Sequence, residues 1–305
     1  MNGDELAVIV GGTGRLGRLV AALLVAEGRP VRVVGRSIPR EPVPDTDFVA
    51  ADVRRPETLA PALAGAAVVV SAVHGMDPAA GESPASVDRA GNSHLIRAAH
   101  TAGARVVLMS VLGASLDHPM ELFRMKAEAE RQLRATSDDW TIVRASAFAE
   151  LYADLLAQTA AKSGVPRVFG RGRNPINFVA VHDVARAVAR AVTDPGLRGR
   201  VIEVGGPENL TMDQLAARVA PNAHAPGHVP RAALRVISVA AAPFRPGLAR
   251  IARQALLMDR LDLSFDATPS LAAHPWLTAT RIAGRDPSVG PAGTDPGHRR
   301  MSRPV

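Results

Sequence analysis

Short apolar runs alternate with amphipathic stretches along the first half of the chain. The runs are mostly continuous, which is typical of strands that are buried on both faces of a sheet. The stretches between them repeat apolar residues at helical spacing. The expected strands are 6–10, 31–34, 47–51, 66–72, 105–110 and 140–144. The expected helices are 16–27, 56–64, 86–102, 119–135 and 149–162. This alternation predicts an α/β fold with a doubly wound parallel sheet.

The pattern becomes less regular after residue 162. Asp183 and Thr211 stand near the starts of two of the later predicted helices, where we expect them to act as caps. The later expected strands are 176–181 and 201–206. The later expected helices are 182–192, 210–220 and 232–262, and a loop rich in Pro, His and Gly is expected at 221–231.

These patterns predict a division of the chain into three parts. Residues 1–162 form a nucleotide-binding core. Residues 163–283 supply a small substrate lobe, interleaved with the end of the core sheet. Residues 284–305 are rich in Pro and Gly and poor in apolar residues, so we expect a disordered tail.

The run LAVIVGGTGRLG at residues 6–17 carries the strongest functional signal. A buried strand leads directly into a glycine-rich turn and then into a helix, which is the arrangement of the dinucleotide-phosphate cradle in the Rossmann fold. Gly11 would allow the tight turn, Gly14 would let the backbone approach a pyrophosphate, and Gly17 would let the helix pack closely. The helix N-terminus offers N–H groups and a partial positive charge to phosphates. The alternative is a glycine turn that only links a strand to a helix.

The end of the second predicted strand indicates which nucleotide would bind. An acidic residue at this place usually accepts hydrogen bonds from the adenosine ribose of NAD, but here the strand is followed by Arg36. An arginine can bind a 2′-phosphate through charge-assisted hydrogen bonds, so NADP(H) is favoured over NAD(H). The alternative is a solvated arginine. Asp52, at the end of the third strand, could reach the adenine amino group or cap a loop.

Composition excludes several classes of function. The chain has no cysteine, which rules out disulfides and thiolate metal sites, and its nine histidines lack metal-site spacing. The net charge is +7, of which residues 281–305 contribute +3, and no basic run is interleaved with aromatic residues, so no nucleic-acid partner is expected. No apolar stretch is long enough to span a bilayer and no signal peptide is visible, so we expect a cytoplasmic protein.

The chain resembles the NmrA-like, atypical short-chain dehydrogenase/reductase family. The resemblance rests on GGTGRLG at 11–17, Arg36 in VVGRS, Asp52-Val53 and MKAEAERQLRATSDDWTIVRASAF at 125–148. It extends through VAVHDVARAVARAV and VIEVGGPENLTMDQLA to about residue 220. It implies an NAD(P)H-binding Rossmann fold with a small C-terminal substrate lobe.

The resemblance also implies roles for individual residues. It places Gly11, Thr13, Gly14, Arg15, Leu16 and Gly17 in the phosphate loop. It places Arg36 at the 2′-phosphate, Asp52 and Val53 beside the adenine, Ala72 and Val73 along the ribose, and Lys126 near the nicotinamide ribose.

The usual proton donor of short-chain reductases is missing from its expected position. These enzymes place a tyrosine one helical turn before a lysine, but Leu122 stands four residues before Lys126. Lys126 is one of two lysines among 36 basic residues, and a compact ammonium suits ribose hydroxyls, although a surface lysine is the alternative. Tyr152, the only tyrosine, could replace the missing acid or simply pack on its helix. Ser110 could face the nicotinamide or be a buried strand end.

Two functions remain open at this point. The favoured one is an NADPH-dependent oxidoreductase that transfers hydride to a small apolar acceptor such as a quinone, an enone or an imine. The alternative is a non-catalytic NADP(H)-binding redox sensor that acts through a protein partner. Reduction of an added acceptor would support the first, and the sequence leaves an oligomer possible.

Overall fold

The computed structural model describes residues 5–76, 81–220 and 225–282. Its centre is a seven-stranded sheet of order β10-β6-β5-β4-β1-β2-β3, in which every neighbouring pair is parallel. The strands are β1 (Ala7–Val10), β2 (Val31–Gly35), β3 (Thr46–Ala50), β4 (Val68–Ser71), β5 (Arg105–Val111), β6 (Trp140–Ala145) and β10 (Arg200–Val204). The predicted doubly wound parallel sheet is therefore confirmed.

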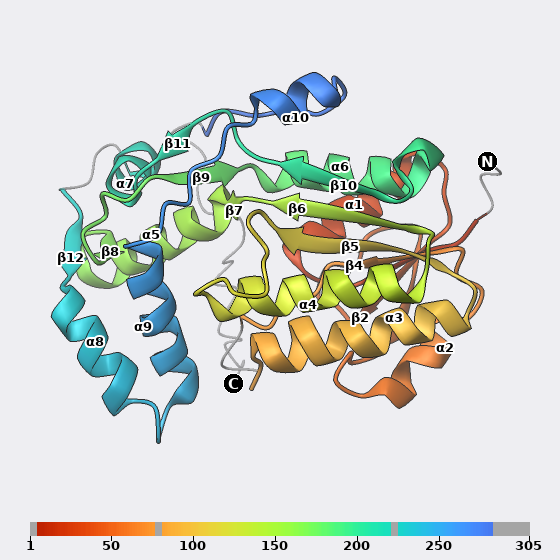
Figure 1. Ribbon diagram of the computed structural model, residues 1–305, viewed down its shortest axis with the longest axis horizontal. Helices are drawn as coiled ribbons and strands as arrows, with labels where there is room; N and C mark the ends of the chain where they lie inside the picture. The colour runs from red at the N-terminus through yellow and green to blue at the C-terminus, as the bar shows by residue number, and fades with distance from the viewer. Residues whose placement is uncertain (1–4, 77–80, 221–224, 283–305) are drawn as a thin grey trace, which may run out of the picture.

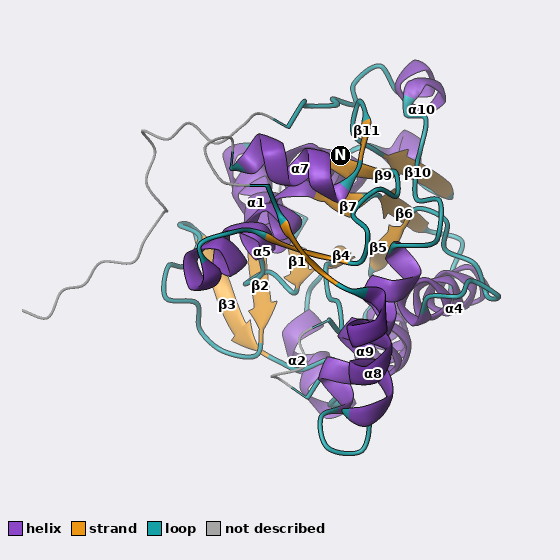
Figure 2. Cartoon of the chain, turned by 90° about the vertical axis from the view of Figure 1, so that its left-hand side faces the viewer, coloured by secondary structure: helices purple, strands orange, loops and turns teal. Residues whose placement is uncertain are grey.

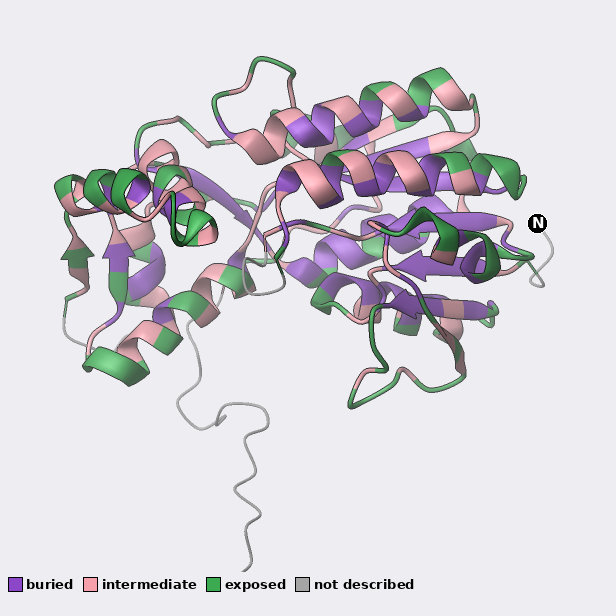
Figure 3. Cartoon of the chain, turned by 90° about the horizontal axis from the view of Figure 1, so that it is seen from below, coloured by how far each residue is buried: buried purple, intermediate pink, exposed green. Residues whose placement is uncertain are grey.

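Helices cover both faces of this sheet (Figure 1). Strand residues alternate between two apolar clusters: Ala7 and Ile9 face one side of β1, while Val8 and Val10 face the other. The first cluster packs against α1 (Arg15–Ala26) and α6 (Val181–Thr193). The second packs against α2 (Leu59–Leu63), α3 (Asn92–Thr101) and α4 (Glu121–Thr136). Figure 3 shows the buried strands between helices whose outer faces are exposed.

A smaller group of elements lies beyond the carboxyl ends of the strands (Figure 1). The helices of this lobe are α5 (Ala149–Ser163), α7 (Met212–Val219), α8 (Arg231–Ala240) and α9 (Pro246–Met258). Its short strands are β7 (Ala147–Phe148), β8 (Arg167–Phe169), β9 (Ile176–Val179), β11 (Asn209–Leu210) and β12 (Gly227–Val229). They form one three-stranded sheet and one two-stranded sheet. The remaining elements are two 3₁₀ turns (Pro56–Thr58 and Pro195–Leu197), η2 (Pro84–Gly91) and α10 (Thr268–Ala273).

The structure corrects two expectations about the second half of the chain. The helix expected at 232–262 is two helices, because the chain turns after Ala240 and Pro246 starts a new helix, as proline at a first helical position does. The loop expected at 221–231 contains β12 in its described part, since Gly227–Val229 pairs with Arg167–Phe169. Residues 284–305 lie outside the described residues, and the boundaries expected at 162 and 283 stay a prediction.

The two predicted caps have different outcomes. Thr211 caps α7 and forms a reciprocal capping box with Gln214, as expected. Asp183 does not cap α6. The Glu150 carboxylate of α5 accepts the Val181 N–H at 3.0 Å instead, so the first turn of α6 is satisfied from another helix. Both Glu150 oxygens lie at that distance.

Asp183 instead holds the segment that follows α10. Its buried carboxylate accepts the Thr278 hydroxyl at 2.7 Å, and the Thr280 N–H and hydroxyl at 2.7 and 3.0 Å. These three bonds join residues almost 100 positions apart and hold Leu277 against the core.

Asp183→Ala should therefore lower the free energy of unfolding by about 1–3 kcal/mol, because it removes a buried charged acceptor from three partly exposed donors. Urea unfolding measures this loss, with Asp138→Ala as the control since Asp138 is exposed. Protease cleavage near residue 280 should become faster in the Asp183 variant alone. Equal stability of the two variants would contradict the role of Asp183.

Candidate functional site

The glycine turn closes tightly at the carboxyl end of β1. Gly11 has φ +84°, and a Cβ placed on it would lie 2.8 Å from the Ala72 carbonyl oxygen beyond β4. A Cβ on Gly17 would lie 2.3 Å from the Gly11 carbonyl oxygen. Both positions thus require glycine, the first for its backbone conformation and a close approach, the second for helix packing alone.

The outer side of this turn fits an anionic group. A Cβ on Gly14 would have a single close neighbour, the Gly11 carbonyl oxygen at 3.3 Å, so this side of the turn is less crowded than Gly11 and Gly17 are. No side chain caps the first turn of α1, which begins at Arg15, and the first N–H groups of a helix have no acceptor within it. Leu16 is buried in the core, so only its backbone could reach a ligand. Thr13 packs its side chain against Gly35.

The Arg15 guanidinium forms an ion pair with Asp154 of α5. The start of α1, beside the glycine turn, is therefore connected directly to the lobe. Both side chains are partly exposed, so the pair can exchange with solvent or with a bound anion.

Two arginines lie at the ends of β2 and β3. Arg36 forms an ion pair with Glu82, and its side chain is 47% exposed whereas that of Glu82 is 9% exposed. Arg54 bonds the Asp52 carboxylate at 2.6–3.0 Å. These contacts place two guanidinium groups and two carboxylates at the edge of the sheet where the sequence predicted the 2′-phosphate.

Hydrogen bonds from Arg54 hold the pKa of Asp52 below its usual value, and Arg36 contributes through its charge. Asp52 is thus bonded to a neighbouring arginine at the start of a loop. Val53 is 6% exposed and packs against Gly91, where a Cβ would lie 2.6 Å from it.

Lys126 is a core residue of the fold. It is 4% exposed, and its ammonium donates to the Val73 carbonyl at 3.0 Å and to the Met109 carbonyl at 2.9 Å. The Asp88 carboxylate, which is fully buried, lies 3.0 Å from the same nitrogen. The ammonium thus makes two hydrogen bonds to carbonyls and one ion pair, and the Asp88 oxygen in that pair accepts no hydrogen bond among the described residues.

Asp88 belongs to η2, a π-helical segment that continues into α3. Its second oxygen accepts the Gly75 N–H at 2.8 Å. Asn92, one turn later, donates to the Asp88 carbonyl and accepts the Ser71 hydroxyl at 2.6 Å. The chain that leaves β4 is therefore fixed by polar bonds to η2 and α3.

Ser110 belongs to a second buried hydrogen-bond network. Its hydroxyl donates to Glu130 at 2.5 Å, and Arg144 of β6 donates to the same carboxylate at 2.9 and 2.7 Å. This contact raises the pKa of Arg144 above its usual value. Ser110 is 3% exposed, so its hydroxyl lies inside the protein.

Tyr152 packs within the lobe. Its hydroxyl donates to the Met258 sulfur at 3.3 Å, and its ring lies edge-on to Phe178 with centroids 5.4 Å apart. Burial raises the pKa of Tyr152 to about 12. A phenol with this pKa and this partner is poorly suited to donate a proton at neutral pH.

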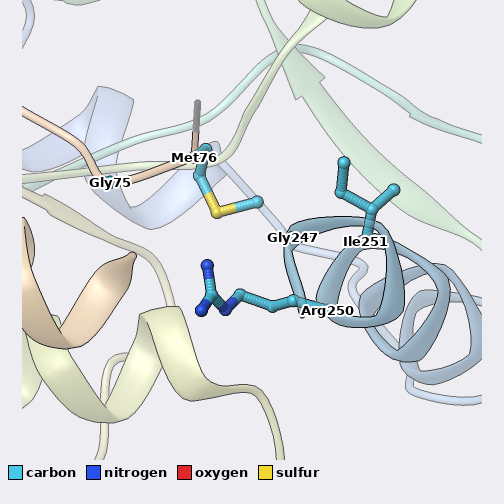
Figure 4. Close-up of a pocket in the computed structure, with 5 residues that line it drawn as sticks. All are labelled: Gly75, Met76, Gly247, Arg250 and Ile251. Carbon is cyan, nitrogen blue, oxygen red and sulfur yellow. The ribbon is translucent and has the colours of Figure 1, made fainter. Parts of the chain in front are cut away.

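A cavity of about 390 Å³ lies between α9 and the starts of α4 and η2. Figure 2 shows α8 and α9 from the lobe side. A smaller pocket of about 10 Å³ adjoins the loop after β4, and in Figure 4 Arg250 of α9 points toward Met76 across it. Arg250 lines both spaces, so the cavity wall reaches the segment that follows Ala72 and Val73.

The structure brings most predicted site residues to one edge of the sheet. Those residues are Gly11, Gly14, Arg15, Arg36, Asp52, Ala72, Val73 and Lys126. Tyr152 lies apart from them, in the lobe. Sequence reasoning missed Glu82, Asp88 and Glu130, because a lone acid on a helix or loop gives no sign of its partner. Arg54 had a local signal, since it follows Asp52 by two residues.

We expect Gly17→Ala and Gly14→Ala to have different effects. The first puts a methyl group against turn backbone and should lower stability by about 1–3 kcal/mol. The second places its methyl group 3.3 Å from one backbone oxygen, so it should cost clearly less stability than the first while weakening nucleotide binding. Thermal unfolding and nucleotide titration of both variants check this. Equal destabilisation by the two would contradict the assignment.

Lys126→Met should lower the free energy of unfolding by about 3–5 kcal/mol, because it leaves the Asp88 charge buried without a counter-ion. Adding Asp88→Asn removes that charge, so the double variant should recover part of the loss. A double-mutant cycle in urea measures the coupling. Additive effects would show that the ion pair is not the reason for the burial of Lys126.

Comparison with known proteins agrees with this geometry. A model of an NAD(P)H-binding family matches residues 11–195, more than half of the chain. The NAD(P)H azoreductase of Xenophilus azovorans is 26% identical over 288 residues, 92% of this chain and 93% of that protein. The photosystem II assembly factor Ycf39 of a Synechocystis strain is 30% identical over 243 residues, 75% of this chain and 72% of that protein.

A solved structure shows the same fold. The NADPH-dependent quinone oxidoreductase QOR2 of Escherichia coli, complexed with NADPH, superposes with a TM-score of 0.69 at 21% identity. The match covers 90% of this chain and 96% of that one. Among the described residues, no helix is long and apolar enough to cross a membrane. The chain belongs to the NAD(P)H-binding family of NmrA-like, atypical short-chain dehydrogenases/reductases.

Proposed function

We propose that this protein is an NADPH-dependent reductase that transfers a hydride to a small acceptor with an apolar body, such as a quinone or an enone. The observation that carries the proposal is the glycine turn with the uncapped N-terminus of α1 beside it. Both share one sheet edge with Arg36. The relatives named as an azoreductase and a quinone oxidoreductase support the reaction class.

The preference for NADPH rests on Arg36. The partly exposed Arg36 guanidinium can reach an anion in solvent, and a phosphate is a stronger acceptor than the Glu82 carboxylate. Glu82 then has to release Arg36 when a 2′-phosphate binds, so it opposes the preference that Arg36 creates.

In this proposal the protein positions the nucleotide and the acceptor and does not itself donate a proton. NADPH, when bound, supplies a hydride. Leu122 cannot donate a proton, Lys126 is buried between two carbonyls and the Asp88 carboxylate, and Tyr152 packs in the lobe. The acceptor therefore takes its proton from water, as a reduced quinone can. Lys126 fixes the ends of β4 and β5, and with them the edge on which the nucleotide would lie.

A second function is favoured by one observation. The Ycf39 relative is named as an assembly factor, and the missing tyrosine suits a protein that binds NADP(H) without turnover. Such a sensor would bind reduced and oxidised nucleotide unequally and change its association with a protein partner. NADPH consumption in the presence of quinones distinguishes the two functions.

Arg36→Ala should weaken NADPH binding by about tenfold to a hundredfold and leave NADH binding nearly unchanged, because it removes a charge-assisted bond to the 2′-phosphate. Glu82→Gln should strengthen NADPH binding. Equilibrium titration with NADPH, NADP⁺, NADH and NAD⁺ measures both effects. Arg40→Ala, in an exposed arginine on the same loop, is the matched control. Equal loss of NADPH and NADH binding in Arg36→Ala would contradict the preference.

A further inference from the structure

The cavity between α9 and the start of α4 has an unusual set of charges. Arg124, Arg250 and Arg253 line it, together with a single carboxylate, Glu121. Arg250 lies 3.5 Å from Glu121, so these two charges offset each other. Arg124 and Arg253 have no carboxylate within 4.0 Å among the residues that the structure describes. The wall therefore carries two uncompensated positive charges.

Backbone carbonyls hold these two arginines in place. Arg124 donates to the His118 carbonyl at 2.7 Å and the Pro119 carbonyl at 2.9 Å. Arg253 donates to the Ser238 carbonyl at 3.0 Å. Neutral carbonyls fix the direction of a guanidinium without cancelling its charge. Each arginine has five N–H donors, so both retain donors for a ligand.

Apart from Gln254, the rest of the wall is apolar. Met120, Pro84 and Leu257 are among the residues that contribute to it. A volume of about 390 Å³ lies within the range of about 300–1,000 Å³ that small-molecule sites occupy. The α4 N-terminus, which has no side-chain cap, adds a partial positive charge on the same side. Apolar walls with fixed cations match a flat aromatic body that carries an acidic group.

The cavity also lies close to the sheet edge of the proposed reaction. Arg124 and Lys126 are two residues apart on α4, and Arg250 lines both the cavity and the pocket at Gly75 and Met76. Arg250 also donates to the Glu82 carbonyl at 3.0 Å. A ligand in the cavity would thus be adjacent to the segment that follows β4.

We propose that this cavity binds the carboxylate or sulfonate of an aromatic acceptor through Arg124 and Arg253. The inference rests on the proposed reductase function, and it narrows the acceptors to aromatic compounds that carry an acidic group. The acid anchors the acceptor, while its apolar body extends toward the ends of β4 and β5.

The first test is binding, which needs no turnover. 2-Naphthalenesulfonate should bind at least tenfold more tightly than 2-naphthol, which has the same rings without the charge. Isothermal titration calorimetry measures the binding with and without NADP⁺. The nucleotide would displace a sulfonate that was bound at the glycine turn, but not one that was bound in the cavity. Equal binding of the two compounds, or displacement of the sulfonate by NADP⁺, would overturn the inference.

Charge variants locate the site. Arg253→Gln and Arg124→Gln should each weaken binding of 2-naphthalenesulfonate by about tenfold. Glu121→Gln should strengthen it about threefold, because it removes the one carboxylate of the wall. Arg260→Gln, in an exposed arginine just after α9, is the control and should change nothing. Arg253 is exposed, so its variant should fold normally even where Arg124→Gln loosens the loop at His118. Unchanged binding in Arg253→Gln would overturn the inference.

A kinetic test separates this inference from the proposed function. With NADPH, 1,4-naphthoquinone-2-sulfonate should show a KM at least tenfold below that of 1,4-naphthoquinone, and Arg253→Gln should remove the difference, whereas Arg260→Gln should keep it. Turnover with equal KM values would leave the reductase function standing and overturn the anion site. Arginine-dependent binding of the sulfonate without reduction of any quinone would support the anion site and overturn the reductase function.

Discussion

The ammonium of Lys126 holds the functional edge of the sheet together. It bonds the carbonyls at the ends of β4 and β5 and lies against the buried Asp88 of η2. Removing two opposite charges from water is costly, and the cost is offset only when each charge has close partners. Asp88 also accepts the Gly75 N–H, so the same ion pair fixes the loop after β4. The positions of Ala72, Val73 and the glycine turn depend on this arrangement, since Gly11 fits directly against Ala72.

Around this rigid centre, the surface charges are arranged in exchangeable pairs. Arg15 pairs with Asp154 of the lobe, and Arg36 with Glu82. The pair of Arg15 and Asp154 is partly exposed on both sides and contributes little to stability, so a phosphate can replace this carboxylate at small cost. Glu82 is 9% exposed, so the release of Arg36 from it costs more. Burial thus separates two roles of charge in the same site. The pair of Lys126 and Asp88 maintains geometry, and the arginine pairs leave groups available for a ligand.

Arginines connect the lobe to the core, beside the apolar contacts that Phe148 and Val179 make with the first cluster. Arg15 reaches α5, and Arg250 of α9 reaches Glu121 and the Glu82 carbonyl. Helix α9 contributes one wall of the cavity, while α4 and η2 contribute the other. Because the site lies between two parts of the chain, substitutions of lobe residues can change which ligand it binds. The sheet edge proposed to bind the nucleotide is not altered by such substitutions.

The sequence by itself determined the parallel sheet and the glycine turn. It singled out Lys126 for a ribose contact, which stays a prediction, and its alternative of a surface lysine is wrong because the side chain is buried. Apolar periodicity and glycine sterics act within a few residues, so they can be recognised along the chain. Only the tertiary structure decided what Lys126 contacts, because Val73, Asp88 and Met109 are 17 to 53 residues away from it. The four shortest strands, with two or three residues each, are too short to show a period. The cavity likewise joins Arg124 to Arg253, and no local pattern reports that two arginines so far apart in the sequence will share a wall.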